Sequence, residues 1–290
     1  MIRRLHGSIA AALTPMRDGG RAVDDAAIPR YSAFLAAGGV DGALVCGTTG
    51  EGMLLDVAER RSVAEAFLTS APADFDVAVH AGAQTSRDTI ALAAHARSVG
   101  AAAVAVVAPP YHPLDDDELT RHLVAAANAA DPLPFYVYEF AARSGYAVPP
   151  AVVSRVGASA PNVVGMKVSD TPFAAVEPYL GLGLDVFIGS EPLAREGLAA
   201  GAVGCVSGLA AAFPEIVAAL VHDRSESAHD QVCRSRDELA GVPFHAALKQ
   251  VLVARDVLVT TDVRPPLRGL TDGERGRVLT LARDLGAVEG

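Results

Sequence analysis

Eight short apolar runs, separated by segments with helical spacing, constrain the fold of this chain more than any other feature. Strands that alternate with helices pair in parallel through crossover connections, and strands that are apolar throughout are buried on both faces. Eight such units in roughly 250 residues predict a closed (β/α)8 TIM barrel, an α/β fold. The runs are residues 7–13, 43–46, 77–81, 103–108, 135–140, 162–170, 186–189 and 203–206.

The segments between and after these runs have apolar residues at helical spacing. Asp56 and Glu59 form a capping-box pattern at the start of one of them. We predict helices at 24–37, 56–70, 86–99, 116–130, 150–158, 172–180 and 193–200, then at 215–222, 226–240, 245–254 and 272–285. The chain is therefore expected to form a barrel over residues 1–213 and a C-terminal helical extension, 214–290, packed on it.

Charge and cysteine content exclude several classes of partner and location. A net charge of -10 makes nucleic acid and anionic membranes poor partners. The 3 cysteines form no CxxC pair, which is typical of reduced thiols in a cytoplasmic protein. Met1–Arg4 and the next apolar run imitate a secretory signal only faintly, because the run ends at Thr14-Pro15. We expect a cytoplasmic protein that is not exported.

One apolar run carries a lysine, Lys167, with no opposite charge until Asp170. Burial disfavours the ammonium form of lysine, and an unprotonated amine is a nucleophile toward a ketone. The alternative is a strand-end lysine whose stem packs while its amine reaches water. The rest of the chain favours the nucleophile.

Reactive residues follow most of the predicted strands. In a (β/α)8 barrel the active site lies at the carboxyl ends of the strands, so these residues are expected to converge. They are Thr48, Thr49, Tyr111, Tyr138, Lys167, Gly189-Ser190-Glu191 and Ser207-Gly208.

Three motifs resemble those of the dihydrodipicolinate synthase/N-acetylneuraminate lyase superfamily, and the resemblance covers nearly the whole chain. The motifs are Gly47-Thr48-Thr49-Gly50-Glu51, Tyr138 followed by Arg143-Ser144-Gly145, and Gly165-Met166-Lys167. The resemblance implies a class I aldolase that forms a Schiff base with pyruvate or a 2-oxo acid. It also implies a homo-oligomer, a dimer or homotetramer, with neither a metal nor an external cofactor.

The resemblance also implies a role for individual residues. Lys167 is the Schiff-base lysine, and Tyr138 is the general acid/base near the imine. Thr48 links Tyr138 to a second tyrosine, Tyr111, which in the family is often donated across a dimer interface.

The substrate-binding residues implied by the resemblance surround those groups. Thr49, with neighbouring backbone N–H groups, matches the clamp on the pyruvate carboxylate, and Gly47 and Val206 complete the binding set. Arg143 matches an arginine near the carboxylate of the aldehyde substrate.

The chain departs from the family pattern at several positions, among them Met53 and Leu54, which make the loop beyond Glu51 bulkier and more apolar than is usual in synthases. Glu139 and Ala141 stand where the family usually has Asn and often Pro, and Pro110 replaces a tyrosine of the lysine-regulated synthases. Glu139 should point toward the helices if Tyr138 points into the barrel. These departures leave the aldehyde partner and regulation by lysine open.

The sequence therefore predicts a dihydrodipicolinate-synthase-like condensation of pyruvate with a carboxylated aldehyde, such as aspartate semialdehyde. One alternative is an aldolase that releases pyruvate from a 2-keto-3-deoxy sugar acid or a related 2-oxo acid. Another is a barrel that binds an oxo acid without turnover. A metal site is not expected, because His80, His95, His112 and His122 form no compact ligand pattern.

Overall fold

Eight parallel strands form a closed barrel in the computed structural model, which describes residues 4–289. Met1, Ile2 and Arg3 of the signal-like start lie outside the described residues. Around the barrel the order is β1-β10-β9-β8-β7-β6-β5-β4, so neighbours in sequence are neighbours in space. The predicted (β/α)8 barrel is confirmed. The strands are β1 (Gly7–Ala11), β4 (Gly42–Val45), β5 (Asp76–His80), β6 (Ala103–Val107), β7 (Phe135–Glu139), β8 (Val163–Val168), β9 (Asp185–Ile188) and β10 (Gly204–Ser207).

Helices follow the strands, close to their predicted positions. The capping box of Asp56 and Glu59 is present at the start of α2. A hairpin of two short strands, β2 (Met16–Arg17) and β3 (Ala22–Val23), and a short helix, α5 (Ala141–Ser144), were not predicted. The other helices up to the eighth barrel helix are α1 (Ile28–Ala37), α2 (Val57–Ser70), α3 (Ser86–Ser98), α4 (Asp116–Ala130), α6 (Pro150–Ser159), α7 (Glu177–Leu180), α8 (Ala194–Ala199) and α9 (Pro214–His222). Helix α7 covers only the last turn of the helix predicted at 172–180, because a separate 3-10 turn at Phe173–Ala175 precedes it.

The alternation of side chains along the strands builds two hydrophobic cores. The inner core fills the barrel and includes Tyr136, Phe187 and Ile9, whereas the outer core packs strands against helices. The Tyr136 hydroxyl accepts a hydrogen bond from the backbone N–H of Leu5, 2.9 Å away. Because successive side chains on a strand face opposite sides, Tyr138 points into the barrel and Glu139 points away from it.

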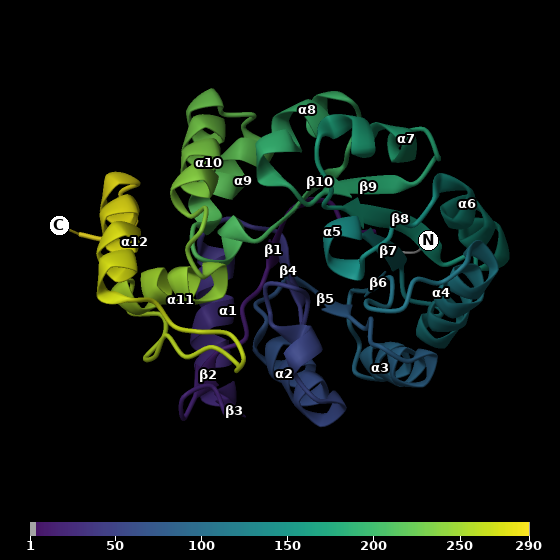
Figure 1. Ribbon diagram of the computed structural model, residues 1–290, viewed down its shortest axis with the longest axis horizontal. Helices are drawn as coiled ribbons and strands as arrows, with labels where there is room; N and C mark the ends of the chain where they lie inside the picture. Colours follow the sequence, from purple (N-terminus) through teal and green to yellow (C-terminus); the bar gives the residue numbers. More distant parts are fainter. Residues whose placement is uncertain (1–3, 290) are drawn as a thin grey trace.

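The helices after the eighth strand divide into two groups. Helix α9 packs against β1 and β10, in the place of the eighth barrel helix. Helices α10 (Glu226–Glu238), α11 (Phe244–Ala254) and α12 (Asp272–Asp284) gather on one side of the molecule, with α12 at its outer edge (Figure 1). The division into residues 1–213 and 214–290 stays a proposal. None of the described helices is long and apolar enough to cross a bilayer.

Candidate active site

Lys167 and Tyr138 lie side by side at the carboxyl ends of β8 and β7, where they are paired in register. The Lys167 side chain is nearly buried, at 7% exposure, and its Nζ lies 4.2 Å from the centroid of the Tyr138 ring. Among the described residues it makes no ion pair with a carboxylate. Gly189 keeps space open beside the amine, since a Cβ there would lie 2.9 Å from the Lys167 Cε.

Thr48 reaches Tyr138 from the loop that follows β4. Its Oγ1 lies 3.2 Å from the Tyr138 hydroxyl, at hydrogen-bonding distance. The loop turns sharply, because Cys46 and Glu51 both have left-handed backbone angles, at φ 58 and 57. A Cβ at Gly52 would lie 1.8 Å from the Cys46 carbonyl oxygen, so only glycine fits there. The tightness of this turn fixes the direction of Thr48.

A cavity of about 430 Å³, here called the Lys167 cavity, opens above these residues. Several of the residues named from the sequence line it, among them Thr48, Thr49, Tyr138, Lys167 and Val206. Gly47 does not line it, and its carbonyl oxygen instead accepts a hydrogen bond from the Gly52 N–H. The remaining lining residues are Phe140, Arg143, Ser169, Thr171, Gly189, Ser190, Gly208, Arg236, Leu239, Ala240, Phe244 and His245.

Tyr111 is not brought to this cavity by its own chain. It is 82% exposed, has a left-handed φ of 82, and packs edge-on against the neighbouring His112. The structure therefore groups Lys167, Tyr138 and Thr48 within one chain and leaves the second tyrosine on the surface.

A larger cavity of about 680 Å³ adjoins the Lys167 cavity, and four residues line both. Its walls are largely apolar and include Met53, Leu54, Pro110 and Leu267. The four shared residues are Thr48, Arg143, Phe244 and His245. They mark the passage between the two spaces.

Arg143 lies on α5 at this passage. Its guanidinium carbon is 5.7 Å from the centroid of the Phe140 ring, and the side chain makes no ion pair with an acid among the described residues. An unpaired guanidinium beside a cavity can bind a carboxylate through two parallel hydrogen bonds.

The C-terminal helices contribute residues that sequence reasoning missed. His245 on α11 lies with its Nε2 3.0 Å from the carbonyl oxygen of Thr48, so Nε2 carries the proton and donates it. Arg236 on α10 lines the Lys167 cavity and pairs with the buried Glu191 at 3.2 Å. No local pattern marks these residues, because the folding back of α10 and α11 over the strand ends brings them here.

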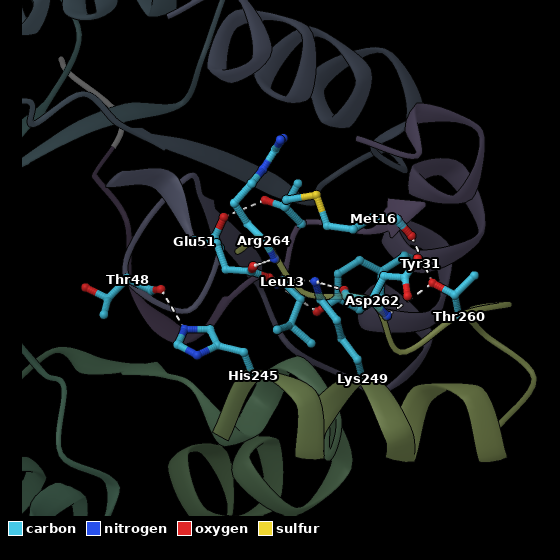
Figure 2. A network of polar contacts seen from close by, with 12 residues as sticks. Leu13, Met16, Tyr31, Thr48, Glu51, His245, Lys249, Thr260, Asp262 and Arg264 are labelled. Atoms are coloured by element: carbon cyan, nitrogen blue, oxygen red, sulfur yellow. Dashed lines mark hydrogen bonds and ion pairs between the residues drawn. The ribbon is translucent and has the colours of Figure 1, made fainter. Parts of the chain in front are cut away.

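One turn further along α11, Lys249 holds the same loop by a buried ion pair. Its Nζ lies 2.5 Å from Glu51 Oε1 and 2.7 Å from the Asp262 carbonyl oxygen. The other carboxylate oxygen of Glu51 accepts a hydrogen bond of 2.6 Å from the backbone N–H of Arg264. Figure 2 shows Lys249 and His245 reaching the loop from one helix. Burial lowers the pKa of Lys249, and the attraction of Glu51 opposes that shift.

His80 supports Tyr138 from behind as a neutral imidazole. Its Nε2 accepts a hydrogen bond from the Val107 N–H, so Nδ1 donates to the Cys46 carbonyl oxygen. Burial and the nearby Arg60 guanidinium lower the pKa of His80 to about 3. Its ring meets that of Tyr138 edge-on at 5.9 Å. Within residues 4–289, no cluster of three His, Cys, Asp or Glu side chains could hold a metal ion.

A (β/α)8 barrel with a buried amine beside a phenol at its carboxyl end has the groups that Schiff-base chemistry requires. Comparison with known proteins gives the family. The model of the Dihydrodipicolinate synthetase family matches residues 4–284, and the chain belongs to this family. The protein is thus a class I lyase of the dihydrodipicolinate synthase family.

The chain is similar both to 4-hydroxy-tetrahydrodipicolinate synthases and to N-acetylneuraminate lyases. The 4-hydroxy-tetrahydrodipicolinate synthase of Acidiphilium cryptum is 36% identical over 218 residues, 73% of each chain. The N-acetylneuraminate lyase of Homo sapiens is 37% identical over 173 residues, 58% of this chain and 54% of that protein. The structure of Proteus mirabilis N-acetylneuraminate lyase matches with a TM-score of 0.87 and 29% identity, over 99% of this chain and 100% of that one.

Proposed function

We propose that the protein condenses pyruvate, held as a Schiff base on Lys167, with an aldehyde that carries its own carboxylate. The observation that supports this substrate class is the unpaired Arg143 at the passage between the two cavities. The similarity to a 4-hydroxy-tetrahydrodipicolinate synthase agrees with it. An aldehyde such as aspartate semialdehyde would meet the Schiff base with its carboxylate on Arg143.

The chemistry follows from the groups in the Lys167 cavity. The Lys167 amine attacks the ketone carbon of pyruvate, and the resulting hydroxyl needs a proton to leave as water. Tyr138 is the nearby acid, and Thr48 can exchange a proton with it because a threonine hydroxyl both donates and accepts. Tyr138, which gave its proton to the leaving water, then takes one from the adjacent methyl carbon, and the electrons of that carbon–hydrogen bond move into the protonated imine to form an enamine. The enamine attacks the aldehyde carbon, and the aldehyde oxygen takes the proton from Tyr138. Thr49 and neighbouring backbone N–H groups bind the pyruvate carboxylate.

The test separates the Schiff base from the aldehyde partner. Pyruvate with borohydride should leave a reduced adduct on Lys167, seen by mass spectrometry, in both the wild type and Arg143→Ala. Arg143→Ala should weaken kcat/KM for a carboxylated aldehyde by about 1.5–3 kcal/mol, the range for a hydrogen bond to a charged group. Arg143→Lys should recover only part of the loss, because an ammonium lacks the planar fork. Equal activity of wild type and Arg143→Ala on that aldehyde would remove Arg143 from substrate binding.

A second candidate is the cleavage of a 2-keto-3-deoxy sugar acid or related 2-oxo acid to pyruvate and an aldehyde. The adjoining cavity of about 680 Å³ favours it, because a polyhydroxylated chain needs more room than a short aldehyde. The similarity to N-acetylneuraminate lyases also supports it. An aldehyde panel assayed in both directions distinguishes the two, and an adduct without turnover of any substrate would indicate an oxo-acid-binding barrel.

We also propose that two or four chains assemble and that the protein acts in the cytoplasm. The surface position of Tyr111 agrees with a role across an interface, since its own chain does not use it. Pro110, beside it, lines the larger cavity.

A further inference from the structure

The segment of residues 140–148, which leaves β7, carries two side chains of the active site. Phe140 stacks on the Tyr138 ring at 6.2 Å between centroids, with an angle of 27° between the ring planes. Arg143 lies in the middle of the segment and lines both cavities. The position of this segment therefore decides where the guanidinium stands.

Two carboxyl groups hold the two ends of that segment. At its start, the backbone N–H of Ala141 donates a hydrogen bond of 3.2 Å to Asp170 Oδ2. At its end, the backbone N–H of Val148 donates one of 2.7 Å to Glu139 Oε2. Glu139 and Asp170 come from the ends of the neighbouring strands β7 and β8, so one acid pair fastens both ends of the segment.

The second carboxyl oxygen of Glu139 indicates that this side chain is protonated beside Asp170. Glu139 is 1% exposed, and its Oε1 is shielded from solvent without a donor among the described residues. A buried carboxyl oxygen without a donor avoids an unpaired charge when its carboxyl carries the proton, and a protonated Glu139 can donate that proton to the Asp170 carboxylate, which holds the other end of the segment. Burial, and then the interaction with Asp170, raise the pKa of Glu139 to about 8.

Two phenols, Tyr179 and Tyr146, lie close enough to Glu139 for its charge to act on them. Tyr179 on α7 donates a hydrogen bond to the Val148 carbonyl oxygen at 2.8 Å, and Tyr146 donates one to the Pro109 carbonyl oxygen at 2.9 Å. Asp170 is the charged side chain that acts on Glu139, and Glu118 acts on Tyr146.

We propose that Glu139 and Asp170 share one proton and together clamp segment 140–148, and that this protonated pair positions Arg143 over the Lys167 cavity. Both acids are positioning residues, and the assignment of the aldehyde carboxylate to Arg143 rests on the proposed function. Loss of the proton leaves two adjacent carboxylates that repel each other, which loosens the segment. Use of the carboxylated aldehyde then falls, while Schiff-base formation on Lys167 continues.

The matched variant is Glu139→Gln, whose amide can donate to Asp170 and accept from Val148 without titrating. Wild type should lose roughly tenfold or more in kcat/KM for a carboxylated aldehyde, relative to Glu139→Gln, as the pH rises from about 7 to 9. Hydrogen exchange of residues 141–148 should become faster in wild type than in Glu139→Gln above pH 8, and equal below pH 7. The pyruvate adduct should form in both proteins at either pH.

Stability tests the shared proton without any substrate. A folded-state pKa raised above the unfolded value means that wild type loses stability as the pH rises toward about 8. The stability of Glu139→Gln relative to wild type should therefore increase between about pH 5 and 8 and stay constant above. A difference that does not change with pH would overturn the shared proton.

Hydrogen exchange that is identical in the two proteins at every pH would overturn the positioning role. If wild type uses no carboxylated aldehyde, the proposed function fails, whereas the stability and exchange measurements still decide this inference.

Discussion

Three side chains surround the Tyr138 phenol, and they differ in whether they can exchange a proton with it. Thr48 Oγ1 lies 3.2 Å from its oxygen, and the Lys167 amine lies over its ring. His80 behind it is neutral and already donates to a backbone carbonyl, so it has no proton to offer at neutral pH. Thr48 is therefore the neighbour through which we expect a proton to reach or leave this tyrosine.

Tyr138→Phe should keep the fold and lose turnover by about a hundred-fold or more, the usual contribution of a general acid or base. Thr48→Val should cause a similar loss, because it preserves the shape of threonine but cannot relay a proton. The measurement is kcat with saturating pyruvate. Tyr31→Phe is the control, since this buried phenol donates to the Ala211 carbonyl oxygen outside both cavities. Near-normal rates in Tyr138→Phe and Thr48→Val would show that protons use another path.

At the scale of elements, α11 holds the catalytic loop through side chains one turn apart. His245 binds the Thr48 carbonyl oxygen, and Lys249 binds Glu51 inside the same loop. Removing one partner of a buried ion pair leaves an uncompensated buried charge, which is strongly destabilising. Replacing both partners leaves no buried charge and costs little stability. The ion pair therefore matters most as a fixed link between the extension and the loop.

Lys249→Met should destabilise the protein by about 3–5 kcal/mol, because Glu51 would stay buried without its cation. The double variant Glu51→Gln/Lys249→Met should cost less than the sum of the two single changes, as measured by denaturant unfolding. Arg195→Met is the control, because it breaks the exposed pair with Glu226 and should cost under about 1 kcal/mol. If Lys249→Met costs no more than Arg195→Met, the buried pair does not hold the loop.

The eight strands and most helices could be predicted because their signals are local. A short apolar run and an amphipathic helix are each defined within a few residues, as the capping box of Asp56 and Glu59 illustrates. The hairpin β2–β3 has strands of 2 residues each, and α5 has 4 residues, too few to show a period.

The site was predictable where barrel geometry determines it. Lys167, Tyr138, Thr48 and Val206 converge because the carboxyl ends of parallel strands meet at one end of a barrel. His245, Lys249 and Arg236 could not be predicted, since their positions depend on how the extension folds back over that end. These contacts join residues far apart in sequence, and no local pattern encodes them.

At the scale of the whole molecule, the exposed side chains near the larger cavity bear on assembly. Tyr111 is 82% exposed, and Met53 and Leu54, which line that cavity, are 41% and 38% exposed. If Tyr111 serves the active site of a neighbouring chain, a complete site needs two chains, and activity depends on assembly.

Mixing two inactive variants tests this dependence. In a dimer of Lys167→Ala with Tyr111→Phe, the chain that keeps Lys167 receives Tyr111 from its neighbour, so one of the two sites is complete. Random assortment of equal amounts, after unfolding and refolding together, should then recover about one quarter of wild-type activity. The control mixes Lys167→Ala with Tyr138→Phe and should recover none, because Tyr138 and Lys167 lie on adjacent strands of one chain. Equal activity in the two mixtures would place the function of Tyr111 within its own chain, whereas a Tyr111→Phe variant that is fully active by itself would place Tyr111 outside catalysis.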